Sequence, residues 1–285
     1  IEDQRMSVLL GLLSALCWGF HDLLVRLISQ RFHILSTLCV VFAISCAGLA
    51  GKLVYSSLSF DIQLEVGILT SLSGALFAFS TYALYRAFEI GPIRRVAPII
   101  GAYPVFSVFW AVFTGAQISL MQWIAVTAVL GGVAFVARNM GETEENYERF
   151  RQALLWSGVC CFGFAVSFAI GQKAILGGDI WVITFYARLS GFLSVLIIGV
   201  LSRRLHRVPL RLLPLLCLLA ILDTGAFAFV TSAGHFSNPE YGTVASSISG
   251  IFAIILGWIF LNERLTPYQW IAVATVFGGI AFLGL

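Results

Sequence analysis

Four ionisable side chains interrupt the apolar runs of this sequence and are the residues best placed to do chemistry. Arg188 and Asp223 each lie near the middle of a run of about 20 apolar residues. A charge in such a run is costly in a bilayer, so it marks a substrate or ion pathway and needs a partner. We expect these two residues to form an ion pair, which either only joins two helices or binds the carboxylate or amine of a zwitterionic substrate.

His21 and Asp22 are adjacent in the first apolar run. Asp22 can reach Arg26 one helical turn later, which would make it part of a structural pair. His21 has two interpretations: a neutral hydrogen-bonding residue, or a proton-coupling group, because imidazole titrates near neutral pH.

Aromatic and hydroxyl side chains extend this candidate site. Trp18, Tyr82 and Tyr103 lie deep in their runs, where an interfacial role is less suitable, and we expect them to line a cavity. Ser246 belongs to a series of hydroxyl residues that either contact substrate or allow close helix packing. The predicted substrate-binding residues are Trp18, His21, Asp22, Tyr82, Tyr103, Arg188, Asp223 and Ser246.

Enzymatic motifs are not convincing in this chain. The triplet Asp223-Thr224-Gly225 occurs in aspartic proteases, but that chemistry needs two carboxylates and here there is one copy in an apolar run. We find no P-loop and no Gly-x-Ser-x-Gly motif. The six cysteines lie in apolar runs without metal-ligand spacing. We therefore expect no catalytic residue, cofactor, metal or nucleic-acid site.

The elements that must position these residues are membrane helices. Of the 285 residues, 59% are hydrophobic and only 11% are charged, with a mean hydropathy of +0.95, whereas an average soluble domain has about 25% charged residues. Ten runs are long enough to cross a bilayer, so we predict an all-α integral membrane protein with ten transmembrane helices. The runs are 7–28, 34–55, 65–86, 94–115, 119–137, 153–173, 180–201, 212–234, 241–261 and 266–285.

The chain contains an internal duplication. Residues 118–137 and 265–284 agree at ten of twenty positions at an offset of 147, including Gln-Trp-Ile-Ala-Val and Gly-Gly-x-Ala-Phe in register. We infer a first five-helix repeat over 1–138, a polar linker over 139–152 and a second five-helix repeat over 153–285. Because five is odd, the second repeat enters the membrane from the opposite side, which gives the inverted repeats common in transporters.

Orientation follows from the basic residues. One side of the predicted bundle carries thirteen arginines and the other only Arg5, Lys52 and Lys173. The positive-inside rule places the arginine-rich side in the cytoplasm and both termini outside.

Short motifs resemble those of the EamA-type permeases of the drug/metabolite transporter superfamily. The motif that closes the second repeat, residues 262–266, reads Asn-Glu-Arg-Leu-Thr and precedes a small-residue helix; residues 114–119 are its counterpart in the first repeat. Two further matches are Trp18-Gly19 after Ala15 in the first run and Tyr103-Pro104-Val105 in the fourth run. The resemblance covers nearly the whole chain. It implies a polytopic inner-membrane permease whose cavity is lined by helices 1–4 and 6–9, with helices 5 and 10 peripheral.

The leading interpretation is a secondary transporter that exports amino acids or similar small polar metabolites by alternating access. Alternatives are a proton-coupled uptake permease and, from other classes, an intramembrane enzyme or a non-transporting scaffold. The expected partners are the small polar metabolite, the lipid bilayer and protons as coupling ion, and the expected assembly is a monomer or homodimer.

Overall fold

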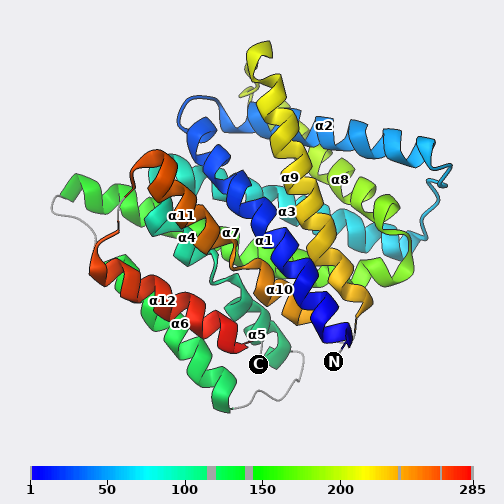
Figure 1. Ribbon diagram of the computed structural model, residues 1–285. Coiled ribbons are helices and arrows are strands. Elements are labelled where there is room, and N and C mark those ends of the chain that lie inside the picture. Colours follow the sequence, from blue (N-terminus) through cyan, green and yellow to red (C-terminus); the bar gives the residue numbers. More distant parts are fainter. Residues whose placement is uncertain (1, 114–119, 139–143, 237–238, 264, 284–285) are drawn as a thin grey trace.

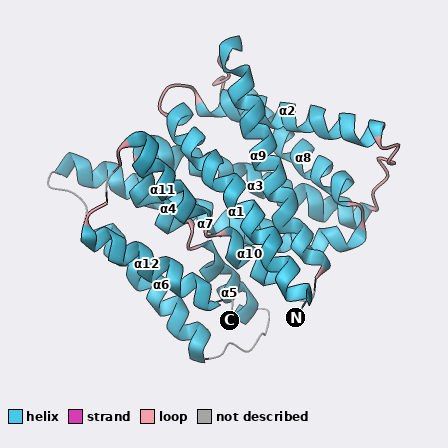
Figure 2. Ribbon diagram, viewed as in Figure 1, coloured by secondary structure: helices cyan, strands magenta, loops and turns pink. Residues whose placement is uncertain are grey.

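The protein is a bundle of helices (Figures 1 and 2). The computed structural model describes residues 2–113, 120–138, 144–236, 239–263 and 265–283, and within these ranges it contains no strand. The α-helices are α1 (Glu2–Ser29), α2 (Ile34–Tyr55), α3 (Leu64–Ile90), α4 (Ile93–Ile100), α5 (Tyr103–Phe113), α6 (Leu120–Arg138), α7 (Glu144–Ala174), α8 (Ile180–Leu201), α9 (Leu213–Ser232), α10 (Pro239–Ser246), α11 (Ser249–Leu261) and α12 (Pro267–Leu283). The all-α prediction is confirmed.

Seven helical segments within the described ranges are long and apolar enough to cross a membrane. The fourth predicted run is divided between α4 and α5, and α12 has only 17 residues, so neither forms one long uninterrupted span. Helix α7 begins at Glu144, inside the segment predicted as a linker. The linker residues 139–143, residues 114–119 and Arg264 lie outside the described part of the chain.

Two helical segments are broken at equivalent points. The first break is at Gly101–Ala102, between α4 and α5, and the second is at Ser247–Ile248, between α10 and α11. The repeat offset of 147 carries residue 101 onto residue 248. The first break lies between Pro98 and Pro104, which lack the backbone N–H that a continuous helix needs.

Helices of the first 138 residues pack largely against helices of the second half of the chain. Helix α1 contacts α9, α10 and α11, and α3 contacts α7 and α8. Ser73 on α3 and Ser167 on α7 each donate a hydrogen bond to the other's carbonyl oxygen at 2.8 Å. The centre of the bundle is therefore an interface between the two halves.

The pair α6 and α12 lies side by side at the edge of this bundle and runs antiparallel (Figure 1). A Cβ atom placed on Gly132 would lie 2.7 Å from Val276, and one placed on Gly279 would lie 2.7 Å from Val129. Residues 129 and 276 are themselves related by the offset of 147, so the two contacts are symmetric. Gly132 and Gly279 are therefore packing sites, because they let the two backbones approach closely.

We expect Gly132→Val and Gly279→Val to destabilise the protein, each by about 1–3 kcal/mol, because the added methyl groups overpack a close helix contact. Thermal unfolding of the purified variants in detergent measures the effect. Gly131→Val and Gly278→Val are matched controls, since a Cβ atom at either neighbouring glycine meets nothing within 4 Å. Equal losses for all four variants would contradict this packing.

Candidate functional site

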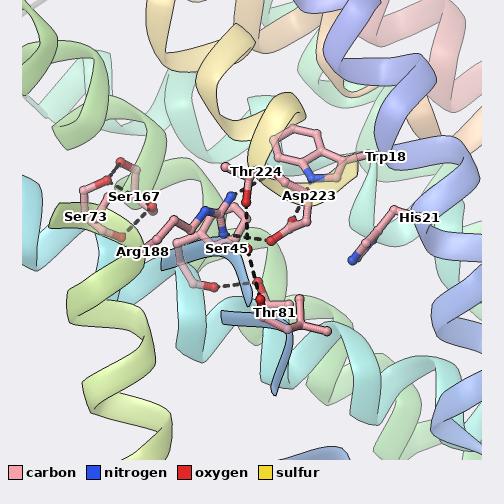
Figure 3. A network of polar contacts seen from close by, with 12 residues as sticks. Trp18, His21, Ser45, Ser73, Thr81, Ser167, Arg188, Asp223 and Thr224 are labelled. Carbon is pink, nitrogen blue, oxygen red and sulfur yellow. Dashed lines mark hydrogen bonds and ion pairs between the residues drawn. The ribbon is translucent and has the colours of Figure 1, made fainter. Parts of the chain in front are cut away.

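The centre of the candidate site is the ion pair between Arg188 on α8 and Asp223 on α9. Arg188 Nη1 donates to Asp223 Oδ2 at 2.7 Å, and Nη2 donates to the Asp223 carbonyl oxygen at 2.8 Å. Trp18 Nε1, from α1, donates to Asp223 Oδ1 at 3.2 Å. Figure 3 shows Arg188 and Trp18 both reaching Asp223. The predicted pair is confirmed, and both of its side chains are almost fully buried.

Three phenylalanine rings surround the Arg188 guanidinium. Its carbon lies 4.5 Å from the ring centroid of Phe77, 4.8 Å from that of Phe227 and 5.4 Å from that of Phe42. The negative faces of aromatic rings stabilise a desolvated cation. The sequence analysis missed these residues, because with 24 phenylalanines in the chain no single one stands out.

Asp22 is paired with its neighbour on α1 and not with Arg26. His21 Nδ1 lies 3.3 Å from Asp22 Oδ1, and both residues are buried. Arg26 instead lies with its Nε 3.4 Å from Glu263 Oε1 and donates to the Phe88 carbonyl oxygen. The expected Asp22–Arg26 pair is therefore wrong: Arg26 reaches a carboxylate from the other half of the chain, which the local sequence does not show.

The Arg26–Glu263 contact joins the two halves of the chain about one helical turn beyond Asp22. Glu263 follows α11, in the second half of the chain, whereas Arg26 is on α1. Glu263 also accepts a hydrogen bond from the Arg94 backbone N–H at 3.3 Å, at the start of α4. One carboxylate thus connects the two halves beside both broken helical segments.

A small cavity of about 20 Å³ lies where these elements meet. Trp18, Asp22, Tyr103 and Asp223 line it, together with residues that flank the two helix breaks, Ile100 and Ser249. A space of about 10–15 Å³ holds one water, so this cavity has room for a water-sized guest but not for a metabolite.

Tyr103 and Ser246 join the two breaks. The Tyr103 hydroxyl donates to the Thr243 carbonyl oxygen at 3.1 Å and is hydrogen-bonded to the Ser246 hydroxyl. Because Tyr103 begins α5 and Ser246 ends α10, this contact ties one break to its counterpart in the other half of the chain.

Four of the eight predicted site residues line this cavity, three more (His21, Arg188 and Ser246) each contact a lining residue, and one lies apart. Tyr82 on α3 packs against Trp156, with ring centroids 5.7 Å apart, and lines a separate groove. Tyr85, one turn later on α3, lies closer to the site: it is fully buried with its ring centroid 6.2 Å from that of His21. Its hydroxyl and His21 Nε2 make no hydrogen bond to the described residues. Residue type alone does not distinguish these two tyrosines.

A helical membrane protein whose two discontinuous helices break beside a buried charged cavity has the architecture of a secondary transporter. The EamA-like transporter family model matches residues 5–138 and again residues 151–285. The chain belongs to the EamA-like transporter family, and it is a transporter rather than an enzyme.

Individual relatives are distant. The putative ribose uptake protein RbsU of Lactiplantibacillus plantarum is 23% identical, over 94% of this chain and 93% of that protein. An uncharacterised transporter in the cobO 3′ region of a Sinorhizobium species is 27% identical over 135 residues, which are 47% of this chain and 95% of that protein. One solved crystal structure matches with a TM-score of 0.69 and 15% identity over 97% of this chain and 95% of that chain, which is a likeness of fold alone.

Replacing one member of the Arg188–Asp223 pair should destabilise the protein more than replacing both. Arg188→Leu or Asp223→Leu leaves a buried charge without its partner, which costs about 3–5 kcal/mol, whereas the double replacement removes both charges. Thermal unfolding of the purified variants provides the measurement.

The exposed Glu148–Arg151 pair is the control, because its side chains are more than half exposed. Glu148→Gln should change the unfolding free energy by less than about 1 kcal/mol. If the double Leu variant loses as much stability as the two single variants added together, the two charges are not coupled.

Proposed function

We propose that this chain carries a small polar metabolite across the cell membrane by alternating access of two inverted five-helix repeats, 1–138 and 153–285, through ten membrane crossings. The observation that supports this most is the cavity between the halves, where both helix breaks, the ion pair and Asp22 meet. The cavity is too small for a metabolite, so substrate entry requires the halves to separate. Rupture of the Arg26–Glu263 contact would open one end.

The candidate site suits an uncharged, hydroxylated solute such as a sugar better than an amino acid. Both terminal nitrogens of Arg188 are occupied by Asp223, so a substrate carboxylate would have to displace a buried partner. His21 Nε2 and the Tyr85 hydroxyl are buried polar atoms that a neutral hydroxyl could satisfy. The similarity to a protein named for ribose uptake agrees with this choice. Amino acids, the substrate class expected from the sequence, are the competing class.

Asp22 makes proton coupling the favoured mechanism. Arg188 balances Asp223, but His21 is the side chain that contacts Asp22 among the described residues. A closed cavity with an unbalanced carboxylate is costly, so closure is favoured when Asp22 carries a proton. This links closure to protonation and would let a proton gradient drive uptake.

Transport into proteoliposomes tests the proposal. With an inwardly directed proton gradient, we expect the purified protein to accumulate labelled D-ribose and to leave L-alanine behind. Asp22→Asn should abolish gradient-driven accumulation, because it removes the carboxylate that carries the proton, while exchange of ribose without a gradient continues. Glu65→Gln, which removes an exposed carboxylate at the start of α3, should have no effect.

The outcomes are distinguishable. Accumulation of L-alanine in place of ribose would restore the amino-acid interpretation. Accumulation that is independent of the proton gradient would overturn the coupling role of Asp22. Failure to move any sugar or amino acid in either direction would overturn the proposed substrate class.

We also propose that the arginine-rich ends of the helices face the cytoplasm of a cell whose inner membrane holds the protein, with both termini outside. A green fluorescent protein fused to Leu285 should then remain dark after Sec-dependent export, whereas alkaline phosphatase at the same position should be active. The positive-inside rule is the reason. A bright fluorescent fusion with inactive phosphatase would reverse the orientation.

A further inference from the structure

A second hollow lies on the outer side of the bundle, away from the central cavity. It is a groove of about 200 Å³ between α3 and α8, and Leu35 of α2 also lines it. Its walls are apolar: Ala75, Ala78 and Phe79 come from α3, and Val195 and Ile198 from α8. Such a lining does not suit the polar solute of a transport pathway.

The two helices form this groove because they are close at one end and carry small residues beyond it. Ser190 on α8 donates to the Ser71 carbonyl oxygen on α3 at 2.9 Å, and Gly74 lies against the α8 backbone at Ala187. Beyond this contact the small side chains of Ala75 and Ala78 leave space between the helices. Both helices are long enough to cross a membrane.

The groove opens onto a surface suited to lipid. Phe79 on one wall is 50% exposed and Ile198 on the other is 49% exposed. Large apolar side chains at this exposure on two membrane-spanning helices face hydrocarbon rather than water. An acyl chain can therefore enter the groove from the side.

A cationic side chain marks the end of the groove. Helix α8 ends at Leu201, Arg203 adopts a left-handed conformation with φ of 53°, and the Arg204 backbone N–H returns to the Gly199 carbonyl oxygen at 3.0 Å. This turn brings Arg204 to the groove, which its side chain helps to line. Within the described residues, the Arg204 guanidinium makes no ion pair or side-chain hydrogen bond.

Two histidines lie near Arg204. The rings of His33 and His206 lie 4.5 Å apart. Burial, followed by His206 and Arg204 nearby, lowers the pKa of His33, and Arg86 acts in the same direction while Glu89 opposes it. Glu89 is itself held in an ion pair with Arg86. Arg204 therefore has no carboxylate partner among the described residues, and an anion there would neutralise its charge.

We propose that the α3–α8 groove binds one anionic phospholipid, with an acyl chain between the helices and the phosphate on Arg204. The apolar walls at membrane depth match the acyl chain, and the unpaired arginine at one end matches the phosphate. Basic pockets between transmembrane helices bind anionic headgroups in this way, and each buried methylene adds affinity. Because α3 and α8 belong to different halves of the chain, the lipid bridges the two repeats.

Native mass spectrometry of the delipidated full-length protein in detergent tests the proposal. We titrate palmitoyl-oleoyl phosphatidylglycerol and, separately, the matching phosphatidylcholine. The first phosphatidylglycerol should bind about fivefold more tightly than the first phosphatidylcholine, the effect of one basic side chain near an anionic lipid. Arg204→Gln should abolish this preference. Arg207→Gln, with the same charge change in the same loop, should retain it.

Two variants test whether an acyl chain occupies the groove. Ala75→Phe fills the groove from α3 and Ser194→Leu fills it from α8, so each should weaken the first binding event for both lipids at least about fivefold. Thermal unfolding checks that each variant is folded. If only one of the two variants folds, its lipid binding alone completes the test.

Three results would overturn the proposal. The first is an unchanged lipid preference in Arg204→Gln. The second is tight binding of the first phosphatidylglycerol by a folded, groove-filled variant. The third is displacement of phosphatidylglycerol by an equal concentration of water-soluble glycerol phosphate, since that would identify a free-phosphate site without an acyl-chain contribution.

Discussion

The buried pair of Arg188 and Asp223 is the constraint around which the centre of this protein is built. Two charges away from water need each other and further favourable contacts to offset their lost hydration. Here the carboxylate has partners from α1 and α8, and three rings face the guanidinium. Helices that are distant in the sequence are thereby fixed around one point. Both terminal nitrogens of Arg188 are used by Asp223, which leaves them unavailable to another anion unless the pair separates.

The two helix breaks are the second feature of this centre. A broken membrane helix exposes backbone groups, which must be buried in protein or line a cavity. Both breaks lie beside the central cavity, and Tyr103 and Ser246 join them. At one end Arg26 and Glu263 hold the halves together. The features that a transporter must rearrange are thus concentrated between the halves, while α6 and α12 form a separate, tightly packed antiparallel pair.

Small residues determine where helices from the two halves pack closely and where space remains between them. Gly132 and Gly279 allow α6 and α12 to approach closely, and they occupy equivalent positions in the duplicated sequence. On the other side of the molecule, small residues of α3 leave a groove that a lipid tail can fill. In lipid there is no hydrophobic drive to bring helices together, so close packing and polar contacts must do so. Both the α6–α12 contact and the α3–α8 groove therefore lie where helices of the two halves meet.

The sequence by itself determined the class of the protein. Composition, the length of the apolar runs and the duplication predicted a helical membrane protein of two repeats, because these depend on local hydropathy and on direct comparison of the two copies. It also placed Arg188 and Asp223 at matching depth, which sufficed to predict their pairing. Only the tertiary structure showed that Arg26 pairs with Glu263 instead of Asp22. It also placed Tyr82 away from the site and Tyr85 near it, and it showed that two helical segments are broken. These outcomes depend on which helices pack against one another, and that packing joins residues more than 200 positions apart, such as Trp18 and Asp223.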